Sequence, residues 1–374
     1  MATFATAEGT RRYAQRFAGT AAPGHFREQH GLLLSSIGIG TYLGEPDART
    51  DQAYTDAAIA AVTGGINVID SAINYRFQRS ERSIGAALKK LAELGYGRDE
   101  LVLCTKGGFL TPDGEMPNDP SAYLFREYVE AGIVRVDDIA AGCHAMTPRY
   151  LEDQLERSLR NLGVDSVDVY YLHNPETQLG AIPREEFVLR VRAAFEYLES
   201  VVSAGKIRFY GMATWNGFRQ PEPAQDYLSL GELEIVAHEV AGDAHHFRFV
   251  QLPYNLAMTE ALTRANQALD TRKLPMIEAA HALEITLVAS ASLLQGQMAR
   301  HLPPFIAEVL GLENDAERAL QFVRSSPGIT TALVGMSSAA HVQANLTLAA
   351  VEPASLEQFE KLFRRSRPAQ PKQA

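Results

Sequence analysis

The strongest constraint on the fold is a regular alternation of short β-branched segments with longer segments of helical period. Strand signals separated by helical segments are typical of parallel strands joined by crossover helices. Eight strands are expected, over residues 37–41, 66–70, 101–106, 167–172, 207–213, 249–252, 286–289 and 331–334. Helices are expected between them, including the segments 54–63, 80–94, 148–162, 184–204, 273–283 and 315–324.

Eight strand–helix units predict an α/β fold of the (β/α)8 TIM barrel type. A doubly wound sheet usually has fewer strands and a glycine fingerprint after the first strand. Here the first expected strand reads IGIGTYLG, which lacks the G-x-G-x-x-G spacing. Because no low-complexity or linker-like segment divides the chain, residues 1–374 are expected to form one domain, with an N-terminal arm over 1–30 and a polar tail over 366–374.

One connection is far longer than an ordinary strand-to-helix loop. It follows the third expected strand and occupies residues 107–144. Within it, SAYLFREYVEAG predicts a short helix with Ser121 as the N-cap and apolar side chains at Tyr123, Leu124, Tyr128 and Val129. Since the connection leaves the carboxyl end of a strand, we expect it on the catalytic face of the barrel, as a lid or pocket wall. A decorative insertion is the alternative.

Charge and cysteine content exclude several classes of protein. With 35 basic and 45 acidic side chains, the formal charge is -10, which disfavours nucleic acid as a partner. Two cysteines, Cys104 and Cys143, cannot form a disulfide framework, so a reducing, cytoplasmic location is expected. No stretch approaches the roughly 18 consecutive apolar residues of a membrane helix, and no secretory pattern opens the chain, so no membrane partner is expected.

Polar residues end three of the expected strands. Asp70, Lys106 and His173 occupy these positions, and Tyr75 follows Asp70 closely. Each alone has an ordinary structural explanation, as a hydrogen-bonded histidine or a lysine–aspartate ion pair. Because strand ends of a barrel share one opening, the four side chains are expected to converge there. Burying four ionisable side chains together costs considerable desolvation free energy and brings no structural gain. This cost favours the interpretation that the four residues form a catalytic group.

The chemistry of these four groups predicts proton transfer. A phenol has an ordinary pKa of about 10, and a nearby ammonium lowers it. Lys106 is therefore expected to tune Tyr75, with Asp70 holding Lys106 charged and His173 donating to the same substrate oxygen. This set suits protonation of a carbonyl oxygen as hydride reaches the carbon. Because no side chain can supply hydride, a nicotinamide cofactor is implied.

Four motifs make a family resemblance specific. DSAINY, RSERSIGAAL, TK and YYLHNP are similar, in this order, to D-[TS]-A-x-x-Y, R-S-E-x-x-[IL]-G-x-A-L, the third-strand lysine and the fourth-strand histidine of the aldo-keto reductase superfamily. The resemblance runs from HFREQHGLLLSSIGIGTYLG to LVGMSSAAHVQANL. It implies a (β/α)8 barrel that binds extended NAD(P)H without a Rossmann domain. It also implies a tetrad of Asp70, Tyr75, Lys106 and His173, with Tyr75 as general acid.

The resemblance implies cofactor contacts as well. The implied set is Gly40, Thr41, Tyr42, Asp70, Thr214, Gln251, Ser290, Leu293, Gly296, Gly335, Ser337, His341 and Asn345. Gly40 to Tyr42 match the first-strand segment beside the nicotinamide, and Gln251 matches the residue that binds its carboxamide.

The chain departs from the family pattern at three of these places. Ala213 and Thr214 stand where Ser-Asn is usual, which leaves the Thr214 hydroxyl as a substitute amide ligand. Ser290 replaces the usual aromatic platform for the nicotinamide. The segment 335–345 lacks the Arg or Lys side chains that grip a 2′-phosphate, although its serines and His341 remain candidate phosphate ligands. The missing cations weaken a preference for NADP and leave NAD or dual use open.

Other conspicuous residues have less specific interpretations. Cys143 and His144, with His173 as a third ligand, would make a poor metal site because adjacent residues seldom supply a tetrahedral pair, so no metal is expected. His245–His246 is expected to be a loop feature. Trp215, the only tryptophan, either walls the nicotinamide site or packs as a buried aromatic.

The leading hypothesis is an NAD(P)(H)-dependent oxidoreductase that interconverts a small-molecule carbonyl and an alcohol through Tyr75. One alternative is a lyase, epimerase or dehydratase on the same barrel, with a tightly held cofactor or none, motivated by Ala213, Ser290 and the missing phosphate clamp. Another is a regulatory protein that senses nicotinamide redox state, as the potassium-channel β subunits of this superfamily do. The sequence indicates neither the substrate nor the oligomeric state.

Overall fold

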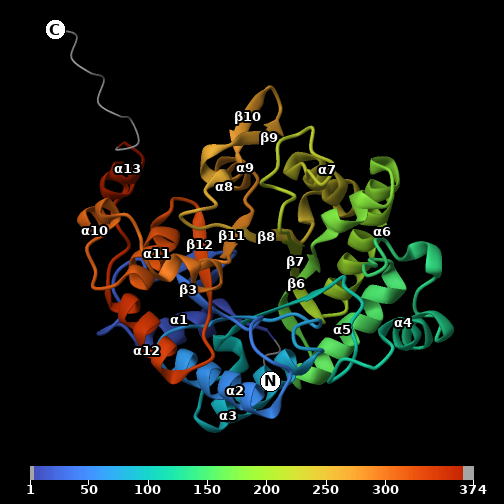
Figure 1. Ribbon diagram of the computed structural model, residues 1–374, viewed down its shortest axis with the longest axis horizontal. Coiled ribbons are helices and arrows are strands. Elements are labelled where there is room, and N and C mark those ends of the chain that lie inside the picture. The colour runs from blue at the N-terminus through green and yellow to red at the C-terminus, as the bar shows by residue number, and fades with distance from the viewer. Residues whose placement is uncertain (1–3, 365–374) are drawn as a thin grey trace.

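Eight parallel strands form a closed ring at the centre of the computed structural model, which describes residues 4–364 (Figure 1). The strands succeed one another around the ring in chain order, and the last pairs with the first. This arrangement confirms the predicted (β/α)8 barrel and its eight strands. Their bounds are Ile37–Gly40 (β3), Val68–Asp70 (β4), Val102–Gly107 (β5), Val167–His173 (β6), Ile207–Ala213 (β7), Phe247–Pro253 (β8), Thr286–Ser290 (β11) and Ile329–Gly335 (β12).

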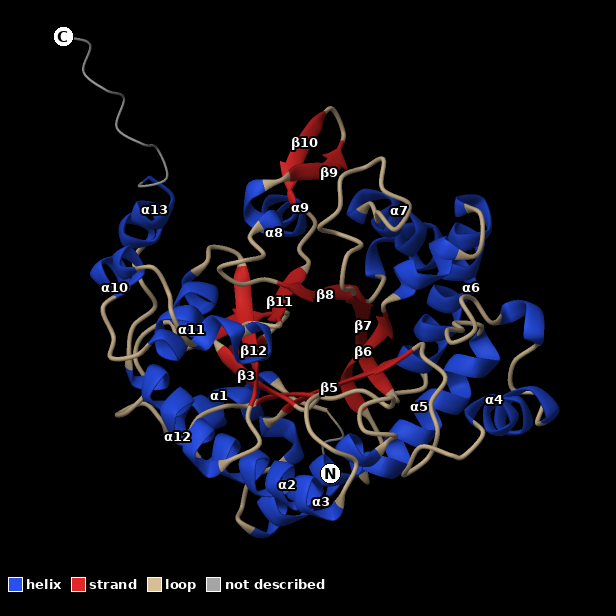
Figure 2. Ribbon diagram, viewed as in Figure 1, coloured by secondary structure: helices blue, strands red, loops and turns tan. Residues whose placement is uncertain are grey.

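Helices surround the ring on its outside (Figure 2). Those between successive strands are α2 (Ala48–Thr63), α3 (Arg79–Glu93), α5 (Pro148–Leu162), α6 (Arg184–Ser203), α7 (Leu230–Ala241), α9 (Met276–Ala282) and α11 (Asp315–Ser325). After the last strand come α12 (Ala339–Thr347) and α13 (Leu356–Arg364), while α8 (Glu260–Thr263) and α10 (Pro304–Leu310) lie in longer connections. None of the helices within residues 4–364 is long and apolar enough to cross a membrane.

One expected helix begins later than predicted. Residues 273–283 were expected to be helical, but Lys273 lies in β10 (Arg272–Pro275), which pairs antiparallel with β9 (Ala265–Leu269). This hairpin projects from the outer surface of the molecule (Figure 1). Pro275 is extended at the N-cap, so α9 begins only at Met276. The helical period of residues 273–283 gives no indication that the first residues of this segment pair with β9.

The N-terminal arm closes the end of the barrel that lies opposite the carboxyl ends of the strands. It contains α1 (Ala7–Arg16) and β1 (Phe26–Gln29), and β1 forms a hairpin with β2 (Leu32–Ser35), which directly follows the arm. Leu32 and Leu34 of β2 belong to the same buried cluster as the interior side chains of the barrel strands. Residues 4–30 are thus packed against the barrel rather than detached from it, and Ala5 lies in that same buried cluster. The expected polar tail, 366–374, lies outside the described residues.

The long connection after β5 folds into short helical pieces. It contains α4 (Pro120–Leu124), which continues directly into a π-helical turn (Phe125–Glu130). Asp119 caps α4, because its carboxylate accepts the backbone N–H of Ala122 at 2.9 Å. The expected N-cap, Ser121, is therefore wrong, and the reason is that Pro120 suits the first helical position and moves the helix start toward the N-terminus. Tyr128 of this segment is buried against Tyr150 of α5.

Short 3-10 turns complete the connections at Arg98–Glu100, Val136–Asp138, Pro175–Gly180, Gly242–Ala244, Leu294–Ala299 and Leu348–Ala350.

The register of the barrel brings the candidate site residues level with one another. Gly40 pairs with Asp70, and Asp70 with Cys104. On the far side, His173 pairs with Ala213, and Ala213 with Gln251. Because all of these lie at or near the carboxyl ends of the strands, their side chains share one opening.

Candidate active site

A buried ion pair forms the centre of the site. Lys106 of β5 donates through Nζ to Oδ1 of Asp70 at 2.5 Å and to the carbonyl oxygen of Ser71 at 2.8 Å. Across the barrel, Gln251 of β8 donates through Nε2 to the other oxygen, Oδ2, of Asp70 at 2.8 Å. Lys106 is fully buried and Asp70 is only 3% exposed. The ammonium group is thus fixed at the end of β4.

The charge state of this pair follows from opposing effects. Burial acts to lower the pKa of Lys106, but the negative charge of Asp70 and the hydrogen bonds to Asp70 and Tyr75 raise the pKa above its ordinary value. Burial raises the pKa of Asp70, while Lys106 and Gln251 oppose that change. Lys106 is therefore a fixed cation beside the site at neutral pH.

Tyr75 lies next to this cation. Its hydroxyl is 3.4 Å from Lys106 Nζ, and the ammonium lies 4.9 Å from its ring centroid. Tyr75 is only half-buried by exposed area, yet protein atoms crowd its hydroxyl, and this burial raises the pKa of Tyr75 above its ordinary value. Lys106 acts to lower the pKa, in the direction that the sequence predicts, but burial outweighs it and the net change is upward.

His173, the last residue of β6, completes the expected group of four. Its ring stands edge-on to Tyr75, with the ring centroids 5.7 Å apart. Burial lowers the pKa of His173 well below its ordinary value, and the charge of Lys106 lowers it further. The imidazole is therefore neutral, so one ring nitrogen donates and the other accepts. Its Nδ1 is buried and has no hydrogen-bond partner among residues 4–364.

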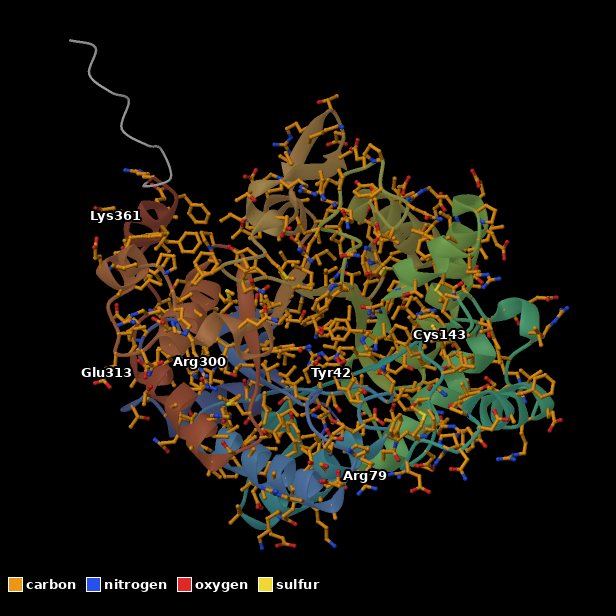
Figure 3. The ribbon with its side chains drawn as sticks, viewed as in Figure 1. Tyr42, Arg79, Cys143, Arg300, Glu313 and Lys361 are labelled. Carbon is orange, nitrogen blue, oxygen red and sulfur yellow. The ribbon has the colours of Figure 1, made fainter. Side chains whose placement is uncertain are left out.

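Aromatic rings extend the site on both sides of Tyr75 and His173. Tyr42 stands edge-on to Tyr75 at a centroid distance of 5.0 Å, and Phe109 stands edge-on to His173 at 5.2 Å. Tyr42 is 57% exposed and appears over the central ring of strands in Figure 3. Phe109 comes from the long connection after β5, which therefore contributes directly to the surroundings of His173.

The expected nicotinamide contacts are only partly available. The hydroxyl of Thr41 donates to the carbonyl oxygen of Asp70 at 3.0 Å and accepts from Ser80 Oγ at 2.6 Å, so its role is to tie the strand ends to α3. Gln251 has its amide nitrogen on Asp70, which leaves the amide oxygen to accept from a ligand.

Two orphaned hydroxyls nevertheless fit a polar ligand. Thr214, directly after β7, donates its backbone N–H to the carbonyl oxygen of Gln251 at 2.9 Å. Its Oγ1 and the Oγ of Ser292 are buried without a hydrogen-bond partner in the part of the chain that the structure describes. Since buried polar atoms are seldom left unpaired, these hydroxyls and the Gln251 oxygen fit the carboxamide of a nicotinamide.

The remaining expected cofactor residues lie at the carboxyl ends of β11 and β12 and on α12. Ser290 and Leu293 are half-buried, and Asn345 is buried. The others are exposed, namely Gly296, Gly335, Ser337 and His341. Ser338 caps α12 by accepting the backbone N–H of His341 at 3.2 Å.

Glu176 is a site residue that the sequence reasoning missed. Its Oε1 accepts backbone N–H groups from Trp215 at 2.7 Å, Asn216 at 3.0 Å and Gly217 at 3.3 Å. Burial raises the pKa of Glu176, and these three N–H groups oppose that change. The carboxylate holds the loop that follows Thr214. The available signal was its place in YYLHNPE, shortly after His173.

His144 is structural. It is fully buried, and its Nε2 donates to the carbonyl oxygen of His173 at 2.7 Å while its Nδ1 accepts from Gln178 at 3.0 Å. Residues 4–364 contain no group of three or more His, Cys, Asp or Glu side chains able to hold a metal ion. His144 thus orients the end of β6.

The histidine pair of the sequence analysis lies apart from this group. His246 Nδ1 lies 2.8 Å from Glu199 Oε2, and His245 is 3.5 Å from Glu234 Oε1, both just before β8 and away from the carboxyl ends of the strands. Trp215 is 43% exposed, so the interpretation as a buried packing aromatic is wrong.

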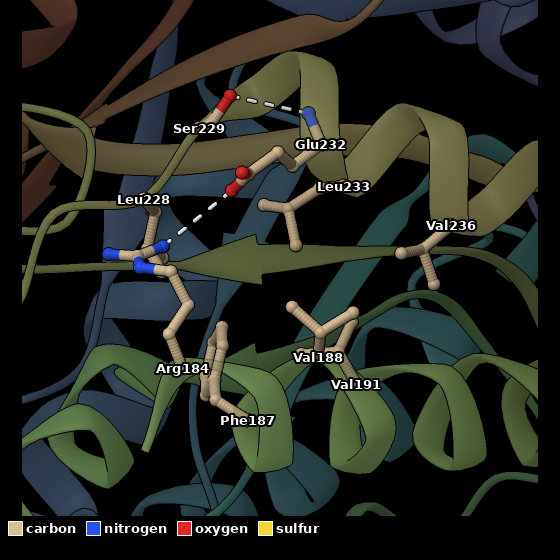
Figure 4. A pocket seen from close by; sticks show the side chains of 9 residues that line it. All are labelled: Arg184, Phe187, Val188, Val191, Leu228, Ser229, Glu232, Leu233 and Val236. Carbon is tan, nitrogen blue, oxygen red and sulfur yellow. Dashed lines mark hydrogen bonds and ion pairs between the residues drawn. The ribbon is translucent and has the colours of Figure 1, made fainter. Parts of the chain in front are cut away.

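A small apolar gap between α6 and α7 is unrelated to the site (Figure 4). Phe187 and Val191 of α6 face Leu233 of α7 across it, and Arg184 lies 3.6 Å from Glu232 at its rim. Its volume of about 10 Å³ holds no more than about one water molecule. It is a packing defect between outer helices.

Comparison with known proteins places the chain in a family. A sequence profile of the Aldo/keto reductase family matches residues 36–364. The chain is 28% identical over 210 residues to the NADH-specific methylglyoxal reductase of Escherichia coli strain K12, covering 55% of this chain and 55% of that protein. It is 30% identical over 190 residues to aldo-keto reductase YhdN of Bacillus subtilis strain 168, covering 50% of this chain and 45% of that protein. The matches thus span about half the length of these curated relatives.

The fold agrees with solved structures. An aldo/keto reductase from Klebsiella pneumoniae, solved in complex with NADP and acetate, superposes with a TM-score of 0.60 at 21% identity and covers 94% of this chain and 98% of that chain. An aldo-keto reductase from Bacillus halodurans in its holo form superposes with a TM-score of 0.62 at 19% identity, covering 93% and 98%. The family profile and the barrel with its buried Asp–Lys pair agree, and the chain therefore belongs to the aldo/keto reductase family.

Proposed function

We propose that this protein is an NAD(P)(H)-dependent oxidoreductase that interconverts a small carbonyl compound and its alcohol, with Tyr75 as general acid and base. The observation that carries this proposal is the position of Lys106 Nζ, 2.5 Å from Asp70 Oδ1 and 3.4 Å from the Tyr75 hydroxyl. A fixed cation beside a phenol, with a neutral imidazole next to it, is an arrangement for moving a proton to and from one oxygen atom.

Each side chain of the site has a separate role in the proposed reaction. A bound nicotinamide supplies or accepts the hydride. Tyr75 donates its hydroxyl proton to the carbonyl oxygen as negative charge develops there, and takes the proton back in the reverse direction. Lys106 stabilises the phenolate that remains, and Asp70 keeps Lys106 charged and oriented. His173 donates a hydrogen bond to the same substrate oxygen, which helps to stabilise its developing charge.

Residues of β7 and β8 would hold the cofactor near these groups. The orphaned Thr214 hydroxyl and the amide oxygen of Gln251 suit the carboxamide. Glu176 fixes the loop after Thr214 through three backbone N–H groups. The long connection after β5 acts as a wall of the substrate pocket in this proposal, supported by the contact of Phe109 with His173.

The segment 335–345 bears on the choice of dinucleotide. It contains no Lys or Arg, and a phosphate dianion needs fixed cations or several donors. We therefore favour NAD(H) as the cofactor, with NADP(H) as the alternative that Ser337 and His341 would serve. The names of the relatives allow either one, since the Escherichia coli protein is NADH-specific and the Klebsiella pneumoniae structure contains NADP.

The test is a comparison of two tyrosine variants with the parent protein. The absorbance of NADH and NADPH is followed with a panel of aldehydes and ketones. Tyr75→Phe should lower turnover by about 10²- to 10⁴-fold, the usual contribution of a positioned acid. Tyr150→Phe is the matched control, because the Tyr150 hydroxyl is buried in α5 without a partner among the described residues. Turnover by Tyr75→Phe equal to that of Tyr150→Phe would refute the proposed role.

A further inference from the structure

The backbone immediately after Tyr75 has an unusual conformation. Arg76, Phe77 and Gln78 have φ angles of 48°, 57° and 70°. Residues with a Cβ atom enter this left-handed region as single residues rather than in runs. Three in succession persist only where the surrounding structure holds them.

Side chains of α2 and α3 hold Arg76 in place. Its guanidinium donates to Asp51 Oδ1 at 2.5 Å and to Ser83 Oγ at 3.2 Å, and it lies 4.8 Å above the ring of Tyr54. The side chain is 1% exposed. Arg76 thus anchors the start of the left-handed turn to the two helices that flank β4.

Residues 112–114 of the long connection hold the rest of the turn. The backbone N–H of Gly114 donates to the carbonyl oxygen of Phe77 at 2.9 Å. The amide of Gln78 donates to the carbonyl oxygen of Pro112 at 3.3 Å and accepts from Asn161 Nδ2 at 3.2 Å. Gln78 is 2% exposed. The turn is therefore held from both sides, by α2 and α3 on one and by the long connection on the other.

The side chain of Gln78 has no other structural task. Gln78 is the N-cap residue of α3, but its side chain makes no capping hydrogen bond to that helix. Its bonds go instead to Pro112 and Asn161, on separate segments of the chain. A glycine would reach the same backbone conformation without strain, so the glutamine is explained by these bonds rather than by its backbone.

We propose that Arg76 and Gln78 are positioning residues. Arg76 locks the left-handed turn against α2 and α3, Gln78 locks it against residues 112–114, and together they hold the Tyr75 hydroxyl against Lys106. The long connection is then a brace for the general acid as well as a pocket wall. The inference rests on the proposed function, because it assigns these residues to the reaction of Tyr75. Relaxation of the turn toward right-handed angles would move the residue directly before it, which is Tyr75.

The test removes the side-chain bonds of Gln78 in two variants of different severity. Gln78→Gly removes both side-chain bonds and also relieves the left-handed strain. Gln78→Glu keeps an acceptor for Asn161 but loses the donor to Pro112, so it is the milder variant and keeps the test available if the first fails to fold. Asp270→Gly is the matched control, since Asp270 (φ 52°) is an exposed left-handed residue in the turn between β9 and β10.

Two measurements are made on these variants. The first needs no substrate: the ring resonance of Tyr75, identified in isotopically labelled protein as the one absent from Tyr75→Phe, is followed during a pH titration. Lys106, Asp70, His173 and Tyr42 are the groups that surround it. We expect Gln78→Gly to shift this resonance and raise its titration midpoint, because Lys106 is then less closely placed, with Gln78→Glu in between and Asp270→Gly unchanged.

The second measurement is kinetic. We expect kcat to fall by about 10- to 100-fold in Gln78→Gly, the scale of a misplaced reacting group, with the KM for dinucleotide within about twofold of the parent value. A Tyr75 resonance and titration identical to those of the parent in both Gln78 variants would overturn the inference. Unaltered turnover in Tyr75→Phe would instead overturn the proposed function, so the two failures are distinguishable.

Discussion

Removing one partner of the buried pair Asp70–Lys106 should destabilise the protein strongly. Lys106→Met leaves a carboxylate buried with only Gln251 as its donor, and Asp70→Asn leaves an ammonium buried without a counter-charge. Breaking a buried pair in this way costs about 3–5 kcal/mol of unfolding free energy. With 374 residues and an unfolding entropy of about 2.1 cal/mol/K per residue, this corresponds to a fall in Tm of about 4–6 °C.

The two variants should respond to pH in opposite directions. In Lys106→Met, Asp70 loses the group that lowers its pKa, so its pKa in the folded protein lies further above that of the unfolded chain. Protonation then favours the folded state, and the destabilisation shrinks as the pH falls toward the unfolded value of about 4. In Asp70→Asn, burial lowers the pKa of Lys106 below its unfolded value of about 10.4, so the destabilisation grows as the pH falls and fades in alkaline solution.

The assay is urea denaturation followed by far-ultraviolet circular dichroism, at pH values from about 4.5 to 9, a range between the two unfolded pKa values. The double variant Asp70→Asn/Lys106→Met is the control, because it removes both charges and should be more stable than either single variant. The reasoning would be refuted by single variants that lose less than about 1 kcal/mol, the range of exposed pairs. Equal pH slopes for the two single variants would refute it as well.

Two further predictions concern the loop after β7 and the packing of that strand. Glu176→Ala should weaken NADH binding by about tenfold, because the loop that carries Thr214 loses the acceptor of three backbone N–H groups. A factor of ten is about 1.4 kcal/mol, close to the contribution of one hydrogen bond to a charged group. Glu176→Gln should retain most of the affinity, and equal NADH affinities of Glu176→Ala and the parent in quenching titrations of Trp215 fluorescence would contradict this role. Gly211→Ala should lower the unfolding free energy by about 1–3 kcal/mol, since its Cβ would lie 2.0 Å from the carbonyl oxygen of Phe249. Gly180→Ala meets nothing within 4 Å and should be neutral, so equal unfolding curves for the two glycine variants would contradict the packing argument.

The parts of the structure that the sequence predicts are those that depend on side-chain pattern. Apolar runs that end in Asp70, Lys106 and His173 predict both the barrel strands and the opening where these residues meet. The hydrogen bond between Lys106 and Tyr75 follows from the same pattern, because Tyr75 lies in the turn directly after β4.

The parts that the sequence did not predict depend on backbone geometry. Glu176 acts on three backbone N–H groups, which carry no side-chain signal. The left-handed angles of Arg76 to Gln78 are ordinarily marked by glycine or asparagine, and here neither is present. Lys273 likewise lies in β10 rather than in the helix that its sequence pattern predicts, because β10 pairs with β9 through backbone hydrogen bonds.

The most direct test of the central claim, proton transfer by Tyr75 coupled to hydride transfer from a bound nicotinamide, is an isotope-transfer experiment. The protein is mixed with nicotinamide dinucleotide carrying deuterium at its reactive carbon and with a carbonyl compound that the parent reduces, and the alcohol is analysed by mass spectrometry. The parent should place deuterium on the carbinol carbon. Tyr75→Phe should bind the dinucleotide with parental affinity, read from Trp215 fluorescence, and form almost no labelled alcohol. Labelled alcohol at the parental rate from Tyr75→Phe, or no label in the alcohol formed by the parent, would contradict the account.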